Sequence, residues 1–329
     1  MTVRQRVISV LNGEKPDRLP VFEWATWWDK TIAEWQREDT SCPGGKQSLF
    51  RYFGLDSHHQ FWVVPHDGRL PAPAYHGAPV LKDVRSYREN LRHLFPEERI
   101  ERLKRSLSKI EKIHTAGRTT VWFSLEGFFW FPRTLFGIEN HLYAFYDQAD
   151  LMLEMNESLT AYHRKTLDAI YGILSPEFMT FAEDMSYNHG PMLSKDMYDS
   201  FMLPFYRQIV PEIKKRGTKV LIDTDGNVEP LIPWFAEAGI EGVLPLERQA
   251  GVDVNRIRED FPEWIMIGGF DKTVMHRGEE AMRQEFQRIL PAIRSGRYIP
   301  AVDHQTPPDV TIENYRTYCT LLREFTGKM

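Results

Sequence analysis

Two aspartates at the end of a short apolar stretch could do chemistry together. Residues 219–222 read Lys-Val-Leu-Ile, a brief run that is typical of a parallel strand buried on both faces. The next five residues, Asp-Thr-Asp-Gly-Asn, include turn formers that end the strand. Because strand side chains alternate, Asp223 and Asp225 are expected on one side, at the strand end where barrel enzymes keep their chemistry. The alternative is a plain turn whose acid caps a helix.

Other polar side chains follow the ends of neighbouring predicted strands. Nearly every late strand is followed by an acid, and the last one also by a histidine. Helix capping explains single acids at such positions, since Asp is a favoured cap, but it explains a whole series less well. Because parallel strands end at one rim, we predict a single site. Its expected catalytic residues are Asp184, Asp223, Asp225, Glu247 and His304.

Carboxylates that converge on one site need a compensating partner. Two unit charges about 4 Å apart repel by about 4 kcal/mol at an effective dielectric constant near 20. The acids must therefore share protons, gain a cation or meet a basic side chain such as Arg248. Shared protons would make one acid a general acid. Oxygen ligands with one imidazole would instead favour Mg²⁺, Mn²⁺ or Ca²⁺. The expected ligands of such a cation are Asp223, Asp225, Glu247 and His304.

Aromatic residues crowd two stretches of the chain that lie just after predicted strands. One stretch holds four tryptophans within residues 24–35, and the other is residues 122–131. Aromatic clusters more often fill a core, but loops after strands line pockets, where rings suit a flat organic ligand. The substrate-binding residues we predict from both stretches and from the strand ends are Trp24, Trp27, Trp28, Glu126, Trp130, Tyr187, His189 and Arg248.

Composition excludes several classes of protein. The 329 residues carry a net charge of −5, which gives no support for a nucleic-acid or anionic-membrane partner. Cys42 and Cys319 stand far apart in no metal-binding pattern, which suits a reducing compartment. The sequence has no apolar signal core and no apolar run of membrane-spanning length. We expect a cytoplasmic enzyme for a small-molecule substrate; a homodimer stays open.

Strands and helices alternate from about residue 118 to the end, which predicts a parallel sheet with right-handed crossovers. The predicted strands are residues 19–24, 61–64, 119–126, 177–184, 219–222, 242–246, 265–268 and 298–302. The predicted helices are residues 3–11, 100–113, 150–171, 194–216, 230–238, 254–261, 279–293 and 312–325. We expect an α/β fold, a (β/α)₈ TIM barrel in one domain over residues 1–329. An irregular insertion at residues 29–95 would pack over its mouth.

Several segments, taken in order, resemble the uroporphyrinogen decarboxylase superfamily. They are the opening LNGEKPDRLP, the stretch FAEDMSYNHGPMLSKDMYDSFMLP, residues 219–227, 239–245 and 267–272, and a late stretch at 296–314. The resemblance covers nearly the whole chain and implies a TIM barrel with its site at the carboxyl rim. The superfamily includes corrinoid-linked methyltransferases.

Departures from the family pattern point to one branch. True uroporphyrinogen decarboxylases carry arginines in the loop after the first strand, where this chain has Glu-Trp-Ala-Thr-Trp-Trp at residues 23–28. The zinc methyltransferases carry His-x-Cys where this chain has Asp223-Thr224-Asp225. The resemblance therefore implies a demethylase component that moves a methyl group from a small donor, aromatic or not, to a corrinoid protein. A decarboxylase or lyase for a carboxylated substrate, and a non-catalytic binder of a tetrapyrrole or corrinoid, stay open as alternatives.

Overall fold

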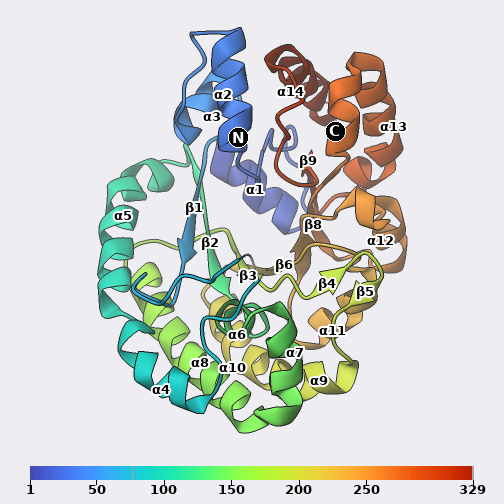
Figure 1. Ribbon diagram of the computed structural model, residues 1–329. Helices are drawn as coiled ribbons and strands as arrows, with labels where there is room; N and C mark the ends of the chain where they lie inside the picture. The colour runs from blue at the N-terminus through green and yellow to red at the C-terminus, as the bar shows by residue number, and fades with distance from the viewer. Residues whose placement is uncertain (76, 328–329) are drawn as a thin grey trace.

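Seven strands form one curled parallel sheet in the computed structural model, which describes residues 1–75 and 77–327 (Figure 1). The strands are β1 (His58–Val63), β2 (Thr120–Glu126), β3 (Phe178–Ala182), β6 (Lys219–Asp223), β7 (Gly242–Leu244), β8 (Ile265–Phe270) and β9 (Tyr298–Val302). They lie side by side in chain order. A separate antiparallel pair consists of β4 (Ser186–Tyr187) and β5 (Gly190–Pro191).

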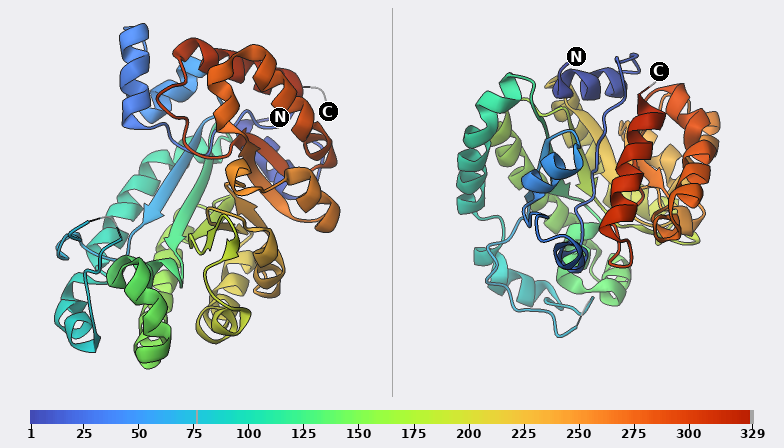
Figure 2. Two further views of the ribbon diagram at one scale, coloured as in Figure 1. Left: turned by 45° about the vertical axis from the view of Figure 1, so that its right-hand side comes forward. Right: turned by 90° about the horizontal axis from the view of Figure 1, so that it is seen from above.

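Helices cover the outer face of the sheet (Figures 1 and 2). The α-helices are α1 (Val3–Leu11), α2 (Asp29–Glu38), α3 (Lys46–Phe53), α4 (Val84–Asn90), α5 (Glu97–Thr115), α6 (Trp130–Phe136), α7 (Ile138–Asp147), α8 (Ala149–Tyr171), α9 (Lys195–Phe201), α10 (Leu203–Lys215), α11 (Ile232–Glu237), α12 (Val254–Asp260), α13 (Glu279–Ser295) and α14 (Ile312–Thr326). Short 3₁₀ turns are η1 (Leu91–His93), η2 (Glu229–Leu231), η3 (Arg248–Ala250) and η4 (Lys272–Arg277). In residues 1–75 and 77–327, no helix combines the length and apolar character that crossing a bilayer requires.

The strands are buried on both faces, as a sheet wrapped by helices requires. Every residue of β2, β3, β8 and β9 is buried. Their side chains belong to one continuous hydrophobic core that also includes the inner faces of α8, α10 and α13. The predicted strand–helix alternation after residue 118 is confirmed, with element ends shifted by a few residues.

The register of the sheet brings the carboxyl ends of its central strands to one level. Ala182 of β3 pairs with Asp223 of β6, and Asp223 pairs in turn with Leu244 of β7. Side chains that follow these three positions therefore leave the sheet next to one another.

The prediction of a first strand at residues 19–24 is wrong, and the structure does not show a fully closed barrel. This stretch runs extended between β1 and β9 and joins no strand ladder in the described part of the chain. Pro20 has no N–H to donate, and the Asp56 carboxylate takes the N–H of Val21 at 2.9 Å. The Trp24 indole, not its backbone, bonds β9, donating to the Val302 carbonyl at 2.8 Å.

The description of residues 29–95 as irregular is also wrong, because this stretch contains α2, α3, β1 and α4. The first two helices lie beside α14 (Figure 2). Trp35 of α2 donates its indole N–H to the Val310 carbonyl at 2.8 Å, just before α14 begins. Helices of eight to ten residues give too little periodic pattern for the sequence to reveal them.

The helix predicted at residues 194–216 is two helices, α9 and α10. Ser194 caps α9, because its hydroxyl accepts the Met197 N–H. The break falls at Met202, just before Pro204, whose ring cannot follow an uninterrupted helical turn.

The segment that fills the gap between β1 and β9 depends on one buried carboxylate. Asp56 accepts two hydrogen bonds from Arg18 at 2.8 Å besides the Val21 N–H. Asp56→Ala should lower the free energy of unfolding by about 2–4 kcal/mol, since it leaves a buried N–H and a guanidinium unpaired. Urea denaturation measures the loss. Exposed Asp309→Ala is the control, with a change below about 0.5 kcal/mol; equal losses in both variants would contradict the assignment.

Candidate functional site

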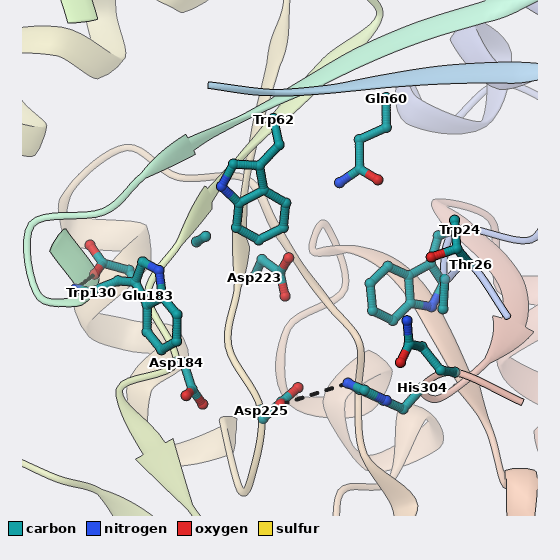
Figure 3. Close-up of a pocket in the computed structure, with 13 residues that line it drawn as sticks. Trp24, Thr26, Gln60, Trp62, Trp130, Glu183, Asp184, Asp223, Asp225 and His304 are labelled. Atoms are coloured by element: carbon teal, nitrogen blue, oxygen red, sulfur yellow. Dashed lines mark hydrogen bonds and ion pairs between the residues drawn. The ribbon is translucent and has the colours of Figure 1, made fainter. Parts of the chain in front are cut away.

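A cavity of about 340 Å³ opens at the carboxyl ends of the strands (Figure 3). Carboxyl groups, indole rings and one imidazole share its wall. The lining residues are Trp24, Ala25, Thr26, Gln60, Trp62, Trp130, Ala182, Glu183, Asp184, Asp223, Asp225, His304 and Gln305. Of the predicted catalytic residues, Asp184, Asp223, Asp225 and His304 thus lie in one cavity, and Glu247 does not line it.

Asp223 ends β6 and stands in the middle of the cavity (Figure 3). Its backbone carbonyl accepts the Glu183 N–H at 2.8 Å, which fixes the residue to the end of β3. Its carboxylate has no hydrogen-bond or ion-pair partner within residues 1–75 and 77–327. Burial raises the pKa of Asp223 well above its usual value, and the charges of Asp225 and Asp184 raise it further. Its surroundings therefore favour the protonated form of the Asp223 carboxyl group.

Asp225 lies two residues further along and faces His304. The nearest carboxylate oxygen is 3.8 Å from the imidazole Nε2. Burial and the charges of Glu247 and Asp184 raise the pKa of Asp225 to about 7, against the opposing charge of Lys272. Burial lowers the pKa of His304, as does Lys272. At neutral pH, Asp225 therefore stands at its midpoint of ionisation beside a mostly neutral imidazole.

Asp184 is the one predicted acid that has a strong cation partner. Its carboxylate lies 2.8 Å from the Arg133 guanidinium of α6, which also bonds the Asp184 carbonyl. The backbone of Asp184 has φ +42°, a left-handed conformation that Asp tolerates better than most residues. The chain turns sharply here, so that successive side chains point in different directions.

Glu247 supports the site from behind. One of its carboxylate oxygens accepts the Gly226 N–H at 3.0 Å, and the other lies 3.7 Å from the Lys272 ammonium. Gly226 must be glycine, because its φ is +81° and an added Cβ would lie 2.6 Å from the Tyr187 backbone. Glu247 thus fixes the turn that carries Asp225, a positioning role that the strand-end pattern alone could not distinguish from catalysis.

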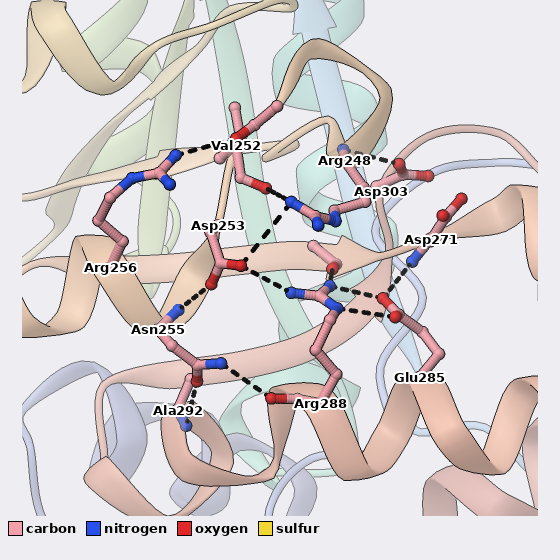
Figure 4. Close-up of polar contacts among 12 residues, drawn as sticks. Arg248, Val252, Asp253, Asn255, Arg256, Asp271, Glu285, Arg288, Ala292 and Asp303 are labelled. Carbon is pink, nitrogen blue, oxygen red and sulfur yellow. Dashed lines mark hydrogen bonds and ion pairs between the residues drawn. The ribbon is translucent and has the colours of Figure 1, made fainter.

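Arg248 does not compensate the cavity acids. Its guanidinium turns away to Asp253, at 3.7 Å, and to the Val252 carbonyl, at 3.3 Å (Figure 4). Its backbone N–H instead contacts the end of the neighbouring strand β9, where it donates to the Asp303 carboxylate at 3.1 Å. Asp303 is fully buried and also accepts the Lys272 N–H at 3.1 Å. The residue just before His304 therefore joins the loops after β7 and β8.

The tryptophans divide between cavity and core. Trp24 and Trp130 line the cavity, as predicted from their positions after strands. Trp27 does not, because it is packed among the rings of Trp35, Phe50 and Tyr315.

Trp28, the residue that precedes the first turn of α2, is 41% exposed and lies outside the cavity. Trp62 of β1 lines the cavity and was not predicted. Trp62 belongs to the second predicted strand, in which alternate side chains point to the same face of the sheet. That alternation was the feature of the sequence from which its position could have been predicted.

Three further predicted binding residues stand near the cavity but do not line it. Tyr187 and His189 sit on the β4–β5 hairpin, exposed and in edge contact with each other. Glu126 is buried behind Trp62, whose indole N–H it accepts at 3.2 Å. Burial raises the pKa of Glu126 to about 7.

Glu183 is buried and lines the cavity. It was not among the predicted site residues, because the sequence does not show how its role differs from that of its neighbour Asp184. Its carboxylate accepts the N–H groups of Phe128, Phe129 and Trp130 at 2.7, 2.8 and 3.0 Å. The Tyr206 hydroxyl donates a further short bond. Burial still raises the pKa of Glu183 to about 7. Its bonds hold the start of α6, and with it Trp130, against the end of β3.

The predicted metal site is not supported. Within residues 1–75 and 77–327, no three His, Cys, Asp or Glu side chains stand close enough to hold a metal ion together. Glu247 is directed to Gly226 and Lys272, and the raised pKa values of Asp223 and Asp225 favour their neutral forms. In the described part of the chain, proton uptake by Asp223 and Asp225 is therefore the compensation that the surroundings of these two acids favour.

A family model described as uroporphyrinogen decarboxylase (URO-D) matches residues 76–325, which is most of the chain. The chain belongs to the uroporphyrinogen decarboxylase family. This URO-D family member has no arginine at residues 23–28. Trp24, which belongs to that stretch, lines the cavity.

Two curated relatives match parts of this URO-D member. The uroporphyrinogen decarboxylase of Chloroherpeton thalassium is 25% identical over 143 residues, 41% of this chain and 39% of the relative. That of Thermosynechococcus vestitus is 24% identical over 115 residues, 34% of this chain and 32% of the relative. Each match thus spans well under half of the relative.

Solved structures resemble the URO-D member only distantly. A putative vitamin-B12 independent methionine synthase from Listeria monocytogenes has 9% identity and a TM-score of 0.45, covering 94% of this chain and 97% of that one. A B12-independent methionine synthase from Shewanella sp. W3-18-1 has 11% identity and a TM-score of 0.42, covering 67% and 64%. Similarity at this level carries no argument about function.

Glu126 allows a test of the buried acids through protein stability. When the pKa of a carboxyl group is higher in the folded than in the unfolded state, the folded protein becomes less stable as the pH rises between the two pKa values. For Glu126 these values are about 4.5 in the unfolded chain and about 7 in the folded one. The Glu126→Gln side chain cannot ionise, so the variant should not lose this stability. Its free energy of unfolding minus that of the wild type should therefore increase by about 2 kcal/mol from pH 5 to pH 8. Urea denaturation at both pH values measures this. Exposed Glu259→Gln should show no such gain, and a pH-independent difference for Glu126→Gln would contradict the raised pKa.

Proposed function

We propose that this URO-D family member is a methyltransferase that moves a methyl group from a small donor to a corrinoid carried by a partner protein. The observation that carries the proposal is the composition of the cavity. Asp223 and Asp225 stand in it with raised pKa values, beside His304 and between indole rings. The URO-D family, in which the chain resembles the corrinoid-linked branch, gives the context.

The difficult event in removing a methyl group is the departure of the oxygen or nitrogen that held it. A carboxyl group that keeps its proton at neutral pH can protonate a leaving oxygen. The same group, once ionised, can pair with a positively charged nitrogen. Both uses require Asp223 and Asp225 at the reacting atom, and neither requires a thiolate. Cys42 and Cys319 are buried elsewhere in the core.

The corrinoid of the partner protein would supply the nucleophile that accepts the methyl group. The cavity is accessible for this, because Trp62 both lines it and is 47% exposed. His304, 3.8 Å from Asp225, can exchange a proton with that carboxyl group through one water. The chain's own contribution is therefore to orient the donor between rings and to place a proton or a charge at the leaving atom.

Decarboxylation of a porphyrinogen fits this cavity less well. Such a substrate carries many carboxylates, and the cavity presents the carboxyl groups of Glu183, Asp184, Asp223 and Asp225. Of the basic side chains near the strand ends, Arg133 is paired with Asp184 at 2.8 Å, so it is not available to a substrate carboxylate. The nearby ammonium of Lys272 is already held by Glu247, at 3.7 Å, and by Asp303, at 3.9 Å.

Methyl transfer to reduced cobalamin, followed by absorbance, tests the role of the two aspartates. The donors are a panel of methoxylated aromatic compounds and methylated ammonium compounds. Asp223→Asn and Asp225→Asn keep the shape of the side chain and remove its charge and acidity. Each should lower the rate by about 10²–10⁴. Asp309→Asn, exposed and outside the cavity, should leave the rate unchanged.

Two outcomes would contradict this function. Full activity in both cavity variants would remove the aspartates from the reaction. Absence of transfer from every donor, together with release of CO₂ from carboxylated analogues, would favour the decarboxylase alternative.

A further inference from the structure

The cavity carries more negative than positive groups. The carboxylate of Asp184 is paired with Arg133, and Glu183 is satisfied by backbone N–H groups. Asp223 has no partner in residues 1–75 and 77–327, and Asp225 has only His304 at 3.8 Å. A cation that entered would therefore find two carboxyl groups available to it.

The indole rings of Trp24, Trp62 and Trp130 line the cavity, and the Arg133 guanidinium lies over one ring of Trp130, 5.1 Å from its centroid. The Trp24 indole N–H is bound to the Val302 carbonyl and that of Trp62 to Glu126. The polar edges of both rings are thus occupied elsewhere. Figure 3 shows Trp24, Trp62 and Trp130 arranged around the carboxylate of Asp223. Several indole rings around a carboxylate form the arrangement that recognises quaternary ammonium groups through cation–π attraction.

We infer that this cavity binds a methylated ammonium ion between Trp24, Trp62 and Trp130, with Asp223 and Asp225 as its counter-charges. The inference rests on the proposed function, because it makes this ion the methyl donor. Neutral aromatic ethers would contact the rings but would offer the two carboxyl groups no positive charge with which to pair.

The reaction of such a donor balances without a proton donor. The carbon–nitrogen bond breaks, its electron pair stays on nitrogen, and the methyl group passes to the reduced corrinoid of the partner protein. The nitrogen leaves as a neutral amine. Because the positive charge is then gone, the attraction to Asp223 and Asp225 is lost and the product can leave.

Binding of such a cation is coupled to protons. The repulsion that raises the pKa values of Asp223 and Asp225 is relieved when a positive charge lies between them. Both acids would then ionise on binding and release protons. Affinity should rise as the pH increases from 6 to 8, because the ionised form of Asp225 becomes more populated through about pH 7.

Titration calorimetry with choline as the probe tests the inference on the full chain. The neutral compound of matching shape is 3,3-dimethylbutan-1-ol. Choline should bind at least about tenfold more tightly than the alcohol at pH 7. Buffers of different ionisation enthalpy should reveal proton release with choline and none with the alcohol.

Variants locate the binding. Trp62→Leu and Asp223→Asn should each weaken choline binding by about tenfold or more and leave alcohol binding much less changed. Trp28→Leu and Asp309→Asn, one exposed ring and one exposed acid outside the cavity, are matched controls that should bind choline as wild type does. Thermal unfolding confirms that each variant is folded. If Asp223→Asn does not fold, the pH dependence of choline binding to wild type decides instead.

The outcomes separate this inference from the proposed function. Equal affinity for choline and the alcohol, or choline affinity that pH and Asp223→Asn leave unchanged, would overturn the inference even if aromatic ethers donate methyl groups. Choline binding with the expected pH dependence, but without methyl transfer from any donor, would support the inference as a binding site and reject the proposed function.

Discussion

The parallel register of β3, β6 and β7 is the constraint on which the site depends. Ala182 pairs with Asp223, and Asp223 pairs with Leu244, so the three strands end at one level. A slip of one residue would turn every side chain of a strand to the opposite face. The close approach of Asp184, Asp223 and Asp225 is thus a consequence of sheet pairing, fixed by the hydrophobic faces of strands that are buried on both sides.

Neighbouring residues at the strand ends differ in the direction and the hydrogen bonding of their side chains. Glu183 and Asp303 turn into the protein, where each carboxylate gathers backbone N–H groups and fixes the loops of the rim. Their successors, Asp184 and His304, face the cavity. Hydrogen bonds offset the cost of burying the first kind of acid. Within residues 1–75 and 77–327 the Asp223 carboxyl group has no such bonds, and its burial raises its pKa well above the usual value.

Much of this could be predicted from sequence, because acids after apolar strands are a local pattern. The late strands, and the meeting of Asp184, Asp223, Asp225 and His304, follow from alternation and parallel pairing. The direction of a side chain after a turn does not. Arg248 and Glu247 stand at a strand end like the others, yet one turns to Asp253 and the other to Gly226. Trp24 and Trp27 differ by only three residues but face the cavity and the core. Such choices depend on loop backbone geometry and on packing against distant elements.

The central claim is that two aspartates in a shared cavity have pKa values raised above the usual range for aspartate. Carbon-13 NMR of the aspartate carboxyl groups, titrated from pH 3 to pH 9, measures this directly. Asp223→Asn and Asp225→Asn assign the two signals. The account predicts that Asp225 titrates near pH 7 and Asp223 at a pH well above the usual range for aspartate. Titration of both near pH 4, as for aspartates in water, would contradict it.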